Sequence, residues 1–173
     1  IVVYGGVTGV MLNTTSGGEK EKILKAIDEL EAGGSTPGES GVKMAYAVAR
    51  NHYIEGGNNR VILATDGDFN VGMKTEAELD ELISRQRESG IYLTCLGVGM
   101  GNYKDSKIQT LAKKGNGNFA YLDNFMEAEK VLLKEFTQTL YAVADNVYMN
   151  VDFNPDYVKE YRLIGFDNKV GAL

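Results

Sequence analysis

Two polar loops hold the side chains of this sequence that are best suited to chemistry. Asp66 directly follows the apolar run 61–65 and opens a glycine-bearing stretch at 66–72. Thr36 lies in the other loop, 33–41, which is rich in glycine and in hydroxyl side chains. Hydroxyl and carboxylate oxygens are hard ligands, and such ligands suit Mg²⁺ or Mn²⁺. Thr36 and Asp66 are therefore the candidate metal ligands.

The apolar run before Asp66 predicts a buried strand within an α/β fold. Between residues 60 and 122, strand-like runs alternate with helical stripes, which is the pattern of βαβ units and of a Rossmann-like, doubly wound, mostly parallel sheet. Asp66 would then lie at the carboxyl end of the sheet, where open α/β folds bind their ligands. The expected strands are 61–65, 91–98 and 119–122. The first four helical stripes are marked by Ile23 and Ile27, by Val42 and Tyr46, by Leu79 and Ile83, and by Ile108 and Leu111. The residues of the last stripe are all expected to face inward, and they are Val131, Leu132, Phe136 and Leu140.

The start of the sequence predicts an antiparallel edge. Residues 1–4 and 10–13 have the composition of short strands, and the connection 5–9 is too short for a parallel crossover. We therefore expect a short antiparallel pair at this end of the chain.

The pattern changes near residue 145. Apolar and polar residues alternate through 147–153, which indicates a half-buried strand, and 161–166 has the composition of a returning strand. We therefore predict one α/β domain at 1–144 and the start of a β-rich extension at 145–173.

The composition excludes several classes of function. The net charge is −6, the pI is about 4.9, and the lysines are dispersed among glutamates, so no nucleic-acid surface is expected. No segment approaches the roughly 20 apolar residues of a membrane-spanning helix. Cys95 is the only cysteine and can form no internal disulfide. Its apolar surroundings predict a small buried side chain and not a reactive thiol.

The sequence indicates enzymatic sites less clearly than it indicates the candidate metal ligands. Asp66 and Asp68 have the Asp-x-Asp spacing of phosphatases that form an aspartyl phosphate, so a metal-dependent phosphohydrolase is the alternative function. His52, the only histidine, lies at a predicted helix end without catalytic neighbours and is expected at the surface. The glycine-rich run 97–101 lacks the Gly-x-Gly-x-x-Gly spacing of a dinucleotide site.

The order of elements and the two polar loops resemble a von Willebrand factor type A domain over residues 1 to about 144. The most specific match is 34–38, followed at the right distance by 64–67. In that family the metal-ion-dependent adhesion site (MIDAS) combines an Asp-x-Ser-x-Ser loop with one Thr and one Asp from later loops. The resemblance implies that Thr36 and Asp66 are those two ligands, and that the metal is Mg²⁺, with Mn²⁺ or Ca²⁺ as substitutes. It further implies a non-enzymatic protein-interaction or adhesion module, in which a partner protein supplies a carboxylate to the metal.

The sequence departs from the family because it contains no Asp-x-Ser-x-Ser. In the family this loop follows the first, central strand, so we expect 1–173 to lack that strand and the first helix, and to bind metal weakly at best. The absent strand would lie between 1–4 and 61–65. We expect its place to be taken by a missing N-terminal segment, by another copy of the chain or, least of all, by the tail. A structural domain with a vestigial metal site is the remaining alternative.

The tail resembles the extension that follows the type A domain in a group of bacterial proteins. The match rests on the runs at 145–147, 151–155 and 161–166. Those proteins are large and are envelope-associated or secreted. The resemblance therefore implies a bacterial protein at the cell envelope or outside the cell, with the cytoplasm left open.

Overall fold

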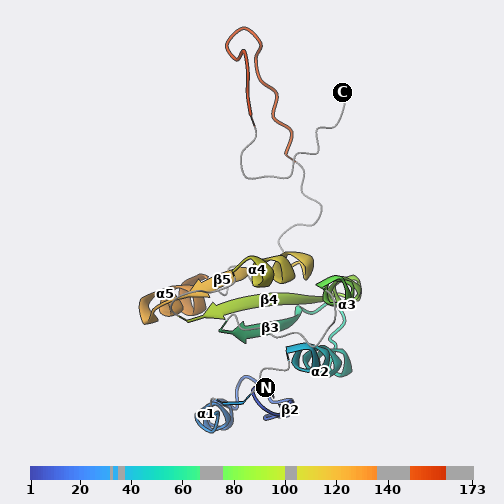
Figure 1. Cartoon of the computed structure of the whole chain (residues 1–173), viewed down its shortest axis with the longest axis vertical. Helices are drawn as coiled ribbons and strands as arrows, with labels where there is room; N and C mark the ends of the chain where they lie inside the picture. The colour runs from blue at the N-terminus through green and yellow to red at the C-terminus, as the bar shows by residue number, and fades with distance from the viewer. Residues whose placement is uncertain (32, 35–37, 67–75, 100–104, 136–148, 163–173) are drawn as a thin grey trace. The chain divides into compact units, whose positions relative to one another are not determined.

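The computed structural model describes residues 1–31, 33–34, 38–66, 76–99, 105–135 and 149–162 (Figure 1). The chain divides into two compact units, Ile1–Tyr141 and Ala142–Leu173. The predicted boundary near residue 145 lies outside the described residues.

A parallel sheet of three strands forms the centre of the first unit. Its strands are β3 (Asn59–Thr65), β4 (Ile91–Val98) and β5 (Phe119–Leu122), in the order β3-β4-β5. Figure 1 shows the strands side by side, with their arrowheads at the same end of the sheet. The predicted α/β fold with a mostly parallel sheet is confirmed, and the predicted bounds of β4 and β5 match the structure.

Helices cover one face of this sheet. They are α2 (Gly38–Asn51), α3 (Glu76–Glu88) and α4 (Asp105–Lys114). The apolar stripes predicted for these helices supply buried side chains that meet alternate residues of β3 and β4. The core on this face contains Val42, Tyr46, Val61, Leu63, Ile83, Ile91, Leu93, Cys95, Ile108, Leu111 and Ala112.

A smaller cluster covers the other face at β4 and β5. It contains Leu96, Leu122 and Val131, and Val131 belongs to η1 (Lys130–Glu135), a π-helical segment that continues α5 (Phe125–Glu129). Leu132 was expected to face inward and is 41% exposed, so that prediction was wrong. A π-helix has more residues per turn than the 3.6 of an α-helix, so a stripe drawn at α-helical spacing points the wrong way. Phe136 and Leu140 lie outside the described residues.

The predicted antiparallel pair is present at the start of the chain. β1 (Val2–Val3) pairs with β2 (Gly9–Val10), and α1 (Lys20–Asp28) follows. Both strands are shorter than expected. The backbone N–H groups of Met11 and Leu12 donate to the Ile1 carbonyl, at 2.9 and 3.2 Å, and close the pair.

The described part of the second unit, 149–162, differs from the expected β extension, because none of it is a strand. Asn154 forms a turn in which its side-chain oxygen accepts from the Asp156 N–H at 2.9 Å. The rings of Phe153 and Tyr161 stack across this turn, with centroids 4.3 Å apart. In the described residues of this unit the backbone N–H groups of Tyr157 and Val158 donate to the nearby Asn154 carbonyl, whereas a strand needs the backbone of a partner strand.

Candidate functional site

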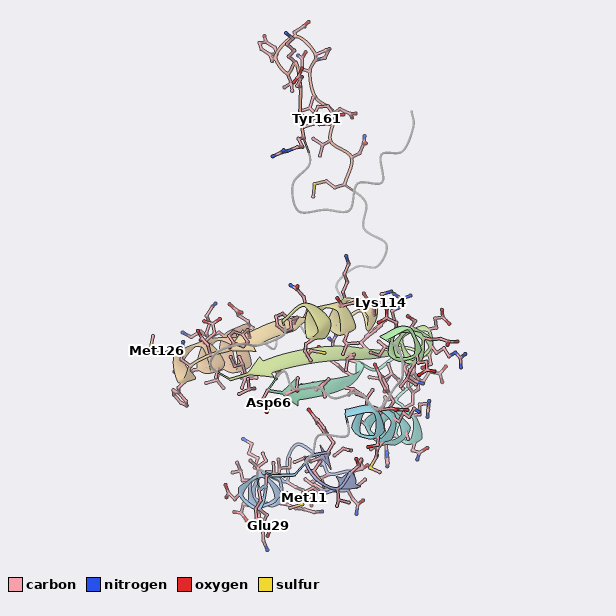
Figure 2. All side chains as sticks on the ribbon, viewed as in Figure 1. Met11, Glu29, Asp66, Lys114, Met126 and Tyr161 are labelled. Atoms are coloured by element: carbon pink, nitrogen blue, oxygen red, sulfur yellow. The ribbon has the colours of Figure 1, made fainter. Side chains whose placement is uncertain are left out.

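The carboxyl ends of the parallel strands form one edge of the sheet. Thr65 lies opposite Gly97, and Gly97 lies opposite Tyr121. Asp66 follows β3 at this edge and is exposed, as Figure 2 shows. Asp66 therefore lies at the carboxyl edge of the sheet, as the apolar run before it predicted.

Tyr4 reaches this edge from the amino-terminal pair of strands. Its hydroxyl donates a hydrogen bond to the carbonyl of Ala64 and also bonds the side chain of Thr65. Burial raises the pKa of Tyr4, the Thr65 bond lowers it, and the negative charge of Asp66 raises it. The Tyr4 hydroxyl is thus within electrostatic reach of the Asp66 carboxylate.

The first turn of α2 packs against the same tyrosine. A Cβ at Gly41 would lie 2.6 Å from the Cβ of Tyr4, so the ring packs on the helix backbone where only glycine leaves room. Next to it, the hydroxyls of Ser40 and Thr8 lie 2.6 Å apart. Tyr4 therefore contacts both the start of α2 and the end of β3.

Thr36, the other predicted ligand, precedes α2 in the chain and lies outside the described residues, as does Asp68. The pairing of Thr36 with Asp66 therefore stays a prediction. The same holds for the Asp-x-Asp alternative.

The described part of this edge offers few ligands for a divalent cation. The Asp66 carboxylate is exposed and is a hard ligand, whereas Thr65 is 6% exposed and its side chain bonds the Tyr4 hydroxyl. Within the described ranges, no group of three or more His, Cys, Asp or Glu side chains could hold a metal. Mg²⁺ requires near-octahedral coordination, so these oxygens could complete a site only together with other ligands.

Gly99, directly after β4, is hydrogen-bonded from the neighbouring strand. The Tyr121 hydroxyl on β5 donates to the Gly99 carbonyl at 2.5 Å. Gly99 has a φ of 143°, a conformation that favours glycine. Sequence reasoning missed both Tyr4 and Tyr121, because no local pattern shows that a tyrosine reaches a distant backbone carbonyl.

Two other reactive residue types lie away from this edge. Burial raises the pKa of Cys95 to about 12, so the thiol is protonated and shielded, as the sequence predicted. His52 is exposed, and its Nδ1 lies 2.9 Å from the Val48 carbonyl. Neither side chain supports a catalytic role.

Comparison with protein-family models gives two matches. Residues 1–138 match the von Willebrand factor type A domain, and residues 138–171 match the C-terminal region of the uncharacterized protein YfbK. The chain is 44% identical over 169 residues to the uncharacterized protein YfbK of Escherichia coli strain K12. That match covers 98% of this chain and 29% of the E. coli protein, so the chain spans less than a third of its relative.

Solved structures share the fold at low sequence identity. The SpRpn10 VWA domain has a TM-score of 0.61 at 15% identity, over 83% of this chain and 74% of that one. BatB from Bacteroides thetaiotaomicron, a conserved hypothetical protein, has a TM-score of 0.60 at 22% identity, over 80% of this chain and 77% of that one. Proximal thread matrix protein 1 from the mussel byssus, with a zinc-occupied MIDAS motif, has a TM-score of 0.55 at 22% identity, over 76% of this chain and 33% of that one.

Proposed function

Because the chain belongs to the von Willebrand factor type A domain family, we propose that it is a non-enzymatic protein-interaction module whose binding depends on a divalent metal ion. The observation that carries the proposal is the position of Asp66. Its carboxylate is exposed at the carboxyl edge of a parallel sheet, next to the ends of β4 and β5. Ligand sites of open α/β folds lie at this edge.

Asp66 contributes little to the fold by its own packing, since its side chain is exposed while its neighbour Thr65 is 6% exposed. An exposed carboxylate that follows a buried strand is accessible to an ion from solvent. One protein of the same fold holds zinc at its MIDAS motif, so this fold is able to hold a metal ion.

Thr36 and Asp66 are the proposed ligands from this chain, and Mg²⁺ is the proposed ion, with Mn²⁺ or Ca²⁺ as substitutes. When bound, the ion supplies a coordination position that accepts a carboxylate oxygen from a partner protein. Thr36 and Asp66 would hold and orient the ion, and Tyr4 would keep the end of β3 in place through the Ala64 carbonyl. The remaining oxygens would come from outside the described residues.

Asp123 provides a matched control for testing Asp66. It follows β5 as Asp66 follows β3, and it is also exposed. The test titrates the full-length protein with Mn²⁺ and follows the free ion by electron paramagnetic resonance. We expect Asp66→Ala to weaken Mn²⁺ binding at least tenfold and Asp123→Ala to leave it unchanged. Equal binding by wild type and Asp66→Ala would reject Asp66 as a ligand.

A separate experiment tests whether Mg²⁺ binding requires ligands other than those in residues 1–173. Calorimetry of the chain 1–173 with Mg²⁺ should show no tight site, because Thr36 and Asp66 supply too few oxygens. Stoichiometric binding at micromolar affinity would show that these residues need no further ligands.

Partner binding is the second measurement on the same variants. Full-length wild type and Asp123→Ala should retain partner protein in the presence of Mg²⁺ and release it with EDTA, whereas Asp66→Ala should retain none under either condition. Retention that is insensitive to EDTA would contradict a metal-dependent interface.

We also propose a location at the bacterial cell envelope or outside the cell. The match of 138–171 to the C-terminal region of YfbK, a protein of Escherichia coli, supports the bacterial source, and the envelope is proposed from the family resemblance alone. In the part of the chain that the structure describes, no helix is long and apolar enough to cross a membrane.

A further inference from the structure

Tyr121 connects β5 to the backbone that directly follows β4. In the register of the sheet Tyr121 lies opposite Gly97, yet its hydroxyl donates to the carbonyl of Gly99 at 2.5 Å, two residues further along the chain. Gly97 has no side chain, so no side chain of that residue lies between the tyrosine ring and Gly99. The Tyr121 side chain therefore reaches past its own register partner to the carboxyl edge of the sheet.

β5 holds Gly99 through both of its backbone polar groups. The Gly99 carbonyl accepts from the Tyr121 hydroxyl, and the Gly99 N–H donates to the Leu122 carbonyl at 3.5 Å. The second distance is at the long limit for a hydrogen bond, so the bond to the tyrosine is the stronger of the two. The position of Gly99 relative to β5 therefore depends more on the Tyr121 hydroxyl than on the Leu122 carbonyl.

Gly99 is also in contact with the backbone of Asp66. A Cβ at Gly99 would lie 4.0 Å from the Asp66 carbonyl oxygen, which is an ordinary van der Waals distance. The sheet register agrees with this contact, because Thr65, directly before Asp66, lies opposite Gly97. The backbone of Gly99 therefore limits where the backbone of Asp66 can lie.

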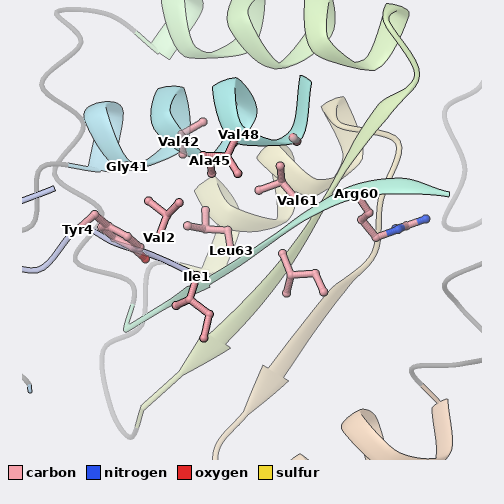
Figure 3. A pocket seen from close by; sticks show the side chains of 12 residues that line it. Ile1, Val2, Tyr4, Gly41, Val42, Ala45, Val48, Arg60, Val61 and Leu63 are labelled. Carbon is pink, nitrogen blue, oxygen red and sulfur yellow. The ribbon is translucent and has the colours of Figure 1, made fainter. Parts of the chain in front are cut away.

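A second tyrosine supports the same edge from the other side of β3. The Tyr4 hydroxyl donates to the Ala64 carbonyl, two residues before Asp66. Figure 3 shows Tyr4 at one end of a pocket and Arg60, near the start of β3, at the other. Two tyrosine hydroxyls thus hold backbone carbonyls near Asp66, one on its own strand and one at Gly99.

We propose that Tyr121 is a positioning residue of the Asp66 site, and that its hydroxyl holds Gly99 against the Asp66 backbone so that the carboxylate keeps the orientation in which it binds a divalent cation. This role presupposes the proposed function of Asp66. Metal sites tolerate changes of only about 0.2 Å in ligand distances, and residues that orient a ligand typically change metal affinity about 10–100-fold. Tyr121 acts through Gly99 and is not itself a ligand.

The first experiment measures the affinity of the full-length protein for Mn²⁺, with the free ion followed by electron paramagnetic resonance. Tyr121→Phe removes the hydroxyl and keeps the ring, so it removes the bond to Gly99 with little change in packing. We expect the dissociation constant for Mn²⁺ to rise about tenfold in this variant.

Asn59 provides a control for a general loss of stability. Its side chain bonds the N–H and carbonyl of Ile54, at 2.9 and 2.8 Å, and the carbonyl of Gly57 at 3.2 Å. It lies seven residues before Asp66, about 23 Å away along an extended strand. Asn59→Ala should lower the thermal midpoint at least as far as Tyr121→Phe, because it removes more hydrogen bonds, and should leave Mn²⁺ affinity unchanged.

A double-mutant cycle tests whether Tyr121 acts through Asp66. In an Asp66→Ala background, Tyr121→Phe should cause no further loss of Mn²⁺ affinity, because the carboxylate that it orients is gone. Losses that add in the double variant would show that Tyr121 acts on binding independently of Asp66, and this would overturn the proposal.

Amide hydrogen exchange gives a readout that needs no metal. Tyr121→Phe should speed exchange at Gly99 at least tenfold, since the remaining bond to the Leu122 carbonyl is weak. The amide of Leu93 on β4 donates to the Gly115 carbonyl at 3.0 Å and is the internal control, with unchanged exchange expected. Unchanged exchange at Gly99 would show that the tyrosine does not hold it.

The Mn²⁺ titrations separate failure of this role from failure of the proposed function. If Asp66→Ala binds Mn²⁺ as wild type does, the proposed function fails and the role of Tyr121 fails with it. If Asp66→Ala loses affinity while Tyr121→Phe binds as wild type does, only the role of Tyr121 is rejected. Equal losses of affinity in Tyr121→Phe and Asn59→Ala would mean that the tyrosine bond acts through stability alone, which also rejects a positioning role.

Discussion

β4 and β3 are neighbours in one parallel sheet, yet the rest of the fold covers them differently. β4 pairs on both edges, and buried residues run along it from Leu93 to Gly97. β3 pairs with β4 alone within the described part, and its buried residues alternate with Ile62 and Ala64, which are exposed. The comparison teaches that two apolar strands of one sheet can differ in cover, since β4 is buried on both faces over most of its length and β3 on one face only.

The largest expected effect contrasts the two strands directly. Leu93 on β4 is fully buried, and Leu93→Ala should lower the free energy of unfolding by about 2–5 kcal/mol. Ile62 on β3 is 46% exposed, and Ile62→Ala should cost less than about 1 kcal/mol in the chain 1–173. Urea denaturation of both variants measures the difference. Equal losses would mean that the exposed face of β3 is covered in solution.

The next effect concerns the contact between Tyr4, directly after β1, and the first turn of α2. Gly41→Ala places a Cβ against the Tyr4 ring and should destabilise by about 1–3 kcal/mol. In a Tyr4→Gly background both the Cβ and the ring of residue 4 are removed, and Gly41→Ala should then stabilise α2 by up to about 1 kcal/mol, since alanine is the better helix former. A double-mutant cycle by denaturant unfolding tests this reversal. A cost that persists without the Tyr4 side chain would contradict the contact.

Cys95 makes the burial of β4 measurable by pH. Its pKa is raised from 9.0 to about 12 in the folded chain, so above pH 9 the unfolded chain loses its thiol proton first. Stability should therefore fall as pH rises from 9 toward 12, by about 1.4 kcal/mol per pH unit from this thiol. Cys95→Ala, compared with wild type in alkaline urea titrations, should show a shallower decline. Parallel pH profiles would show that the thiol is open to solvent.

The smallest effect lies at the start of β3. The Arg60 guanidinium lies 5.7 Å from the Tyr92 ring centroid and donates to the Thr94 hydroxyl at 2.7 Å, which links β3 to β4. Arg60→Lys should cost about 0.5–1 kcal/mol, because an ammonium group stacks and donates less well there. Arg87→Lys on the exposed side of α3 is the control and should be neutral. Thermal unfolding of both variants measures whether the contacts of Arg60 contribute to stability.

Local sequence patterns predicted the secondary-structure elements that are determined by neighbouring residues in the chain. The run 91–98 is apolar and bounded by Gly90 and Gly99, both at positive φ, and its predicted bounds hold. Leu132 was misplaced because its orientation depends on a π-helical turn, which period counting at α-helical spacing does not detect. The strand expected at 147–153 was absent over its described part, because alternation of polar and apolar residues makes a strand possible but does not supply its partner.

The residues of the candidate site also differ in whether a local sequence pattern could locate them. Asp66 could be found because an apolar strand ends directly before it. Tyr4 could not be found, since its partner Ala64 is 60 residues away along the chain and the fold alone brings them together. The metal role of Thr36 and Asp66 rests on the family, and the experiments above test it.

The bond between Tyr4 and Ala64 also has a consequence for biosynthesis. Ribosomes add about 5–20 residues per second, so the 60 residues between donor and acceptor separate their synthesis by roughly 3–12 s. During that time the nascent β1–β2 pair carries Ile1, Val2 and Tyr4 without the surface on which they later pack. The β1–β2 pair is thus synthesised before the strand on which it packs, and its apolar side chains lack that cover until β3 has been made.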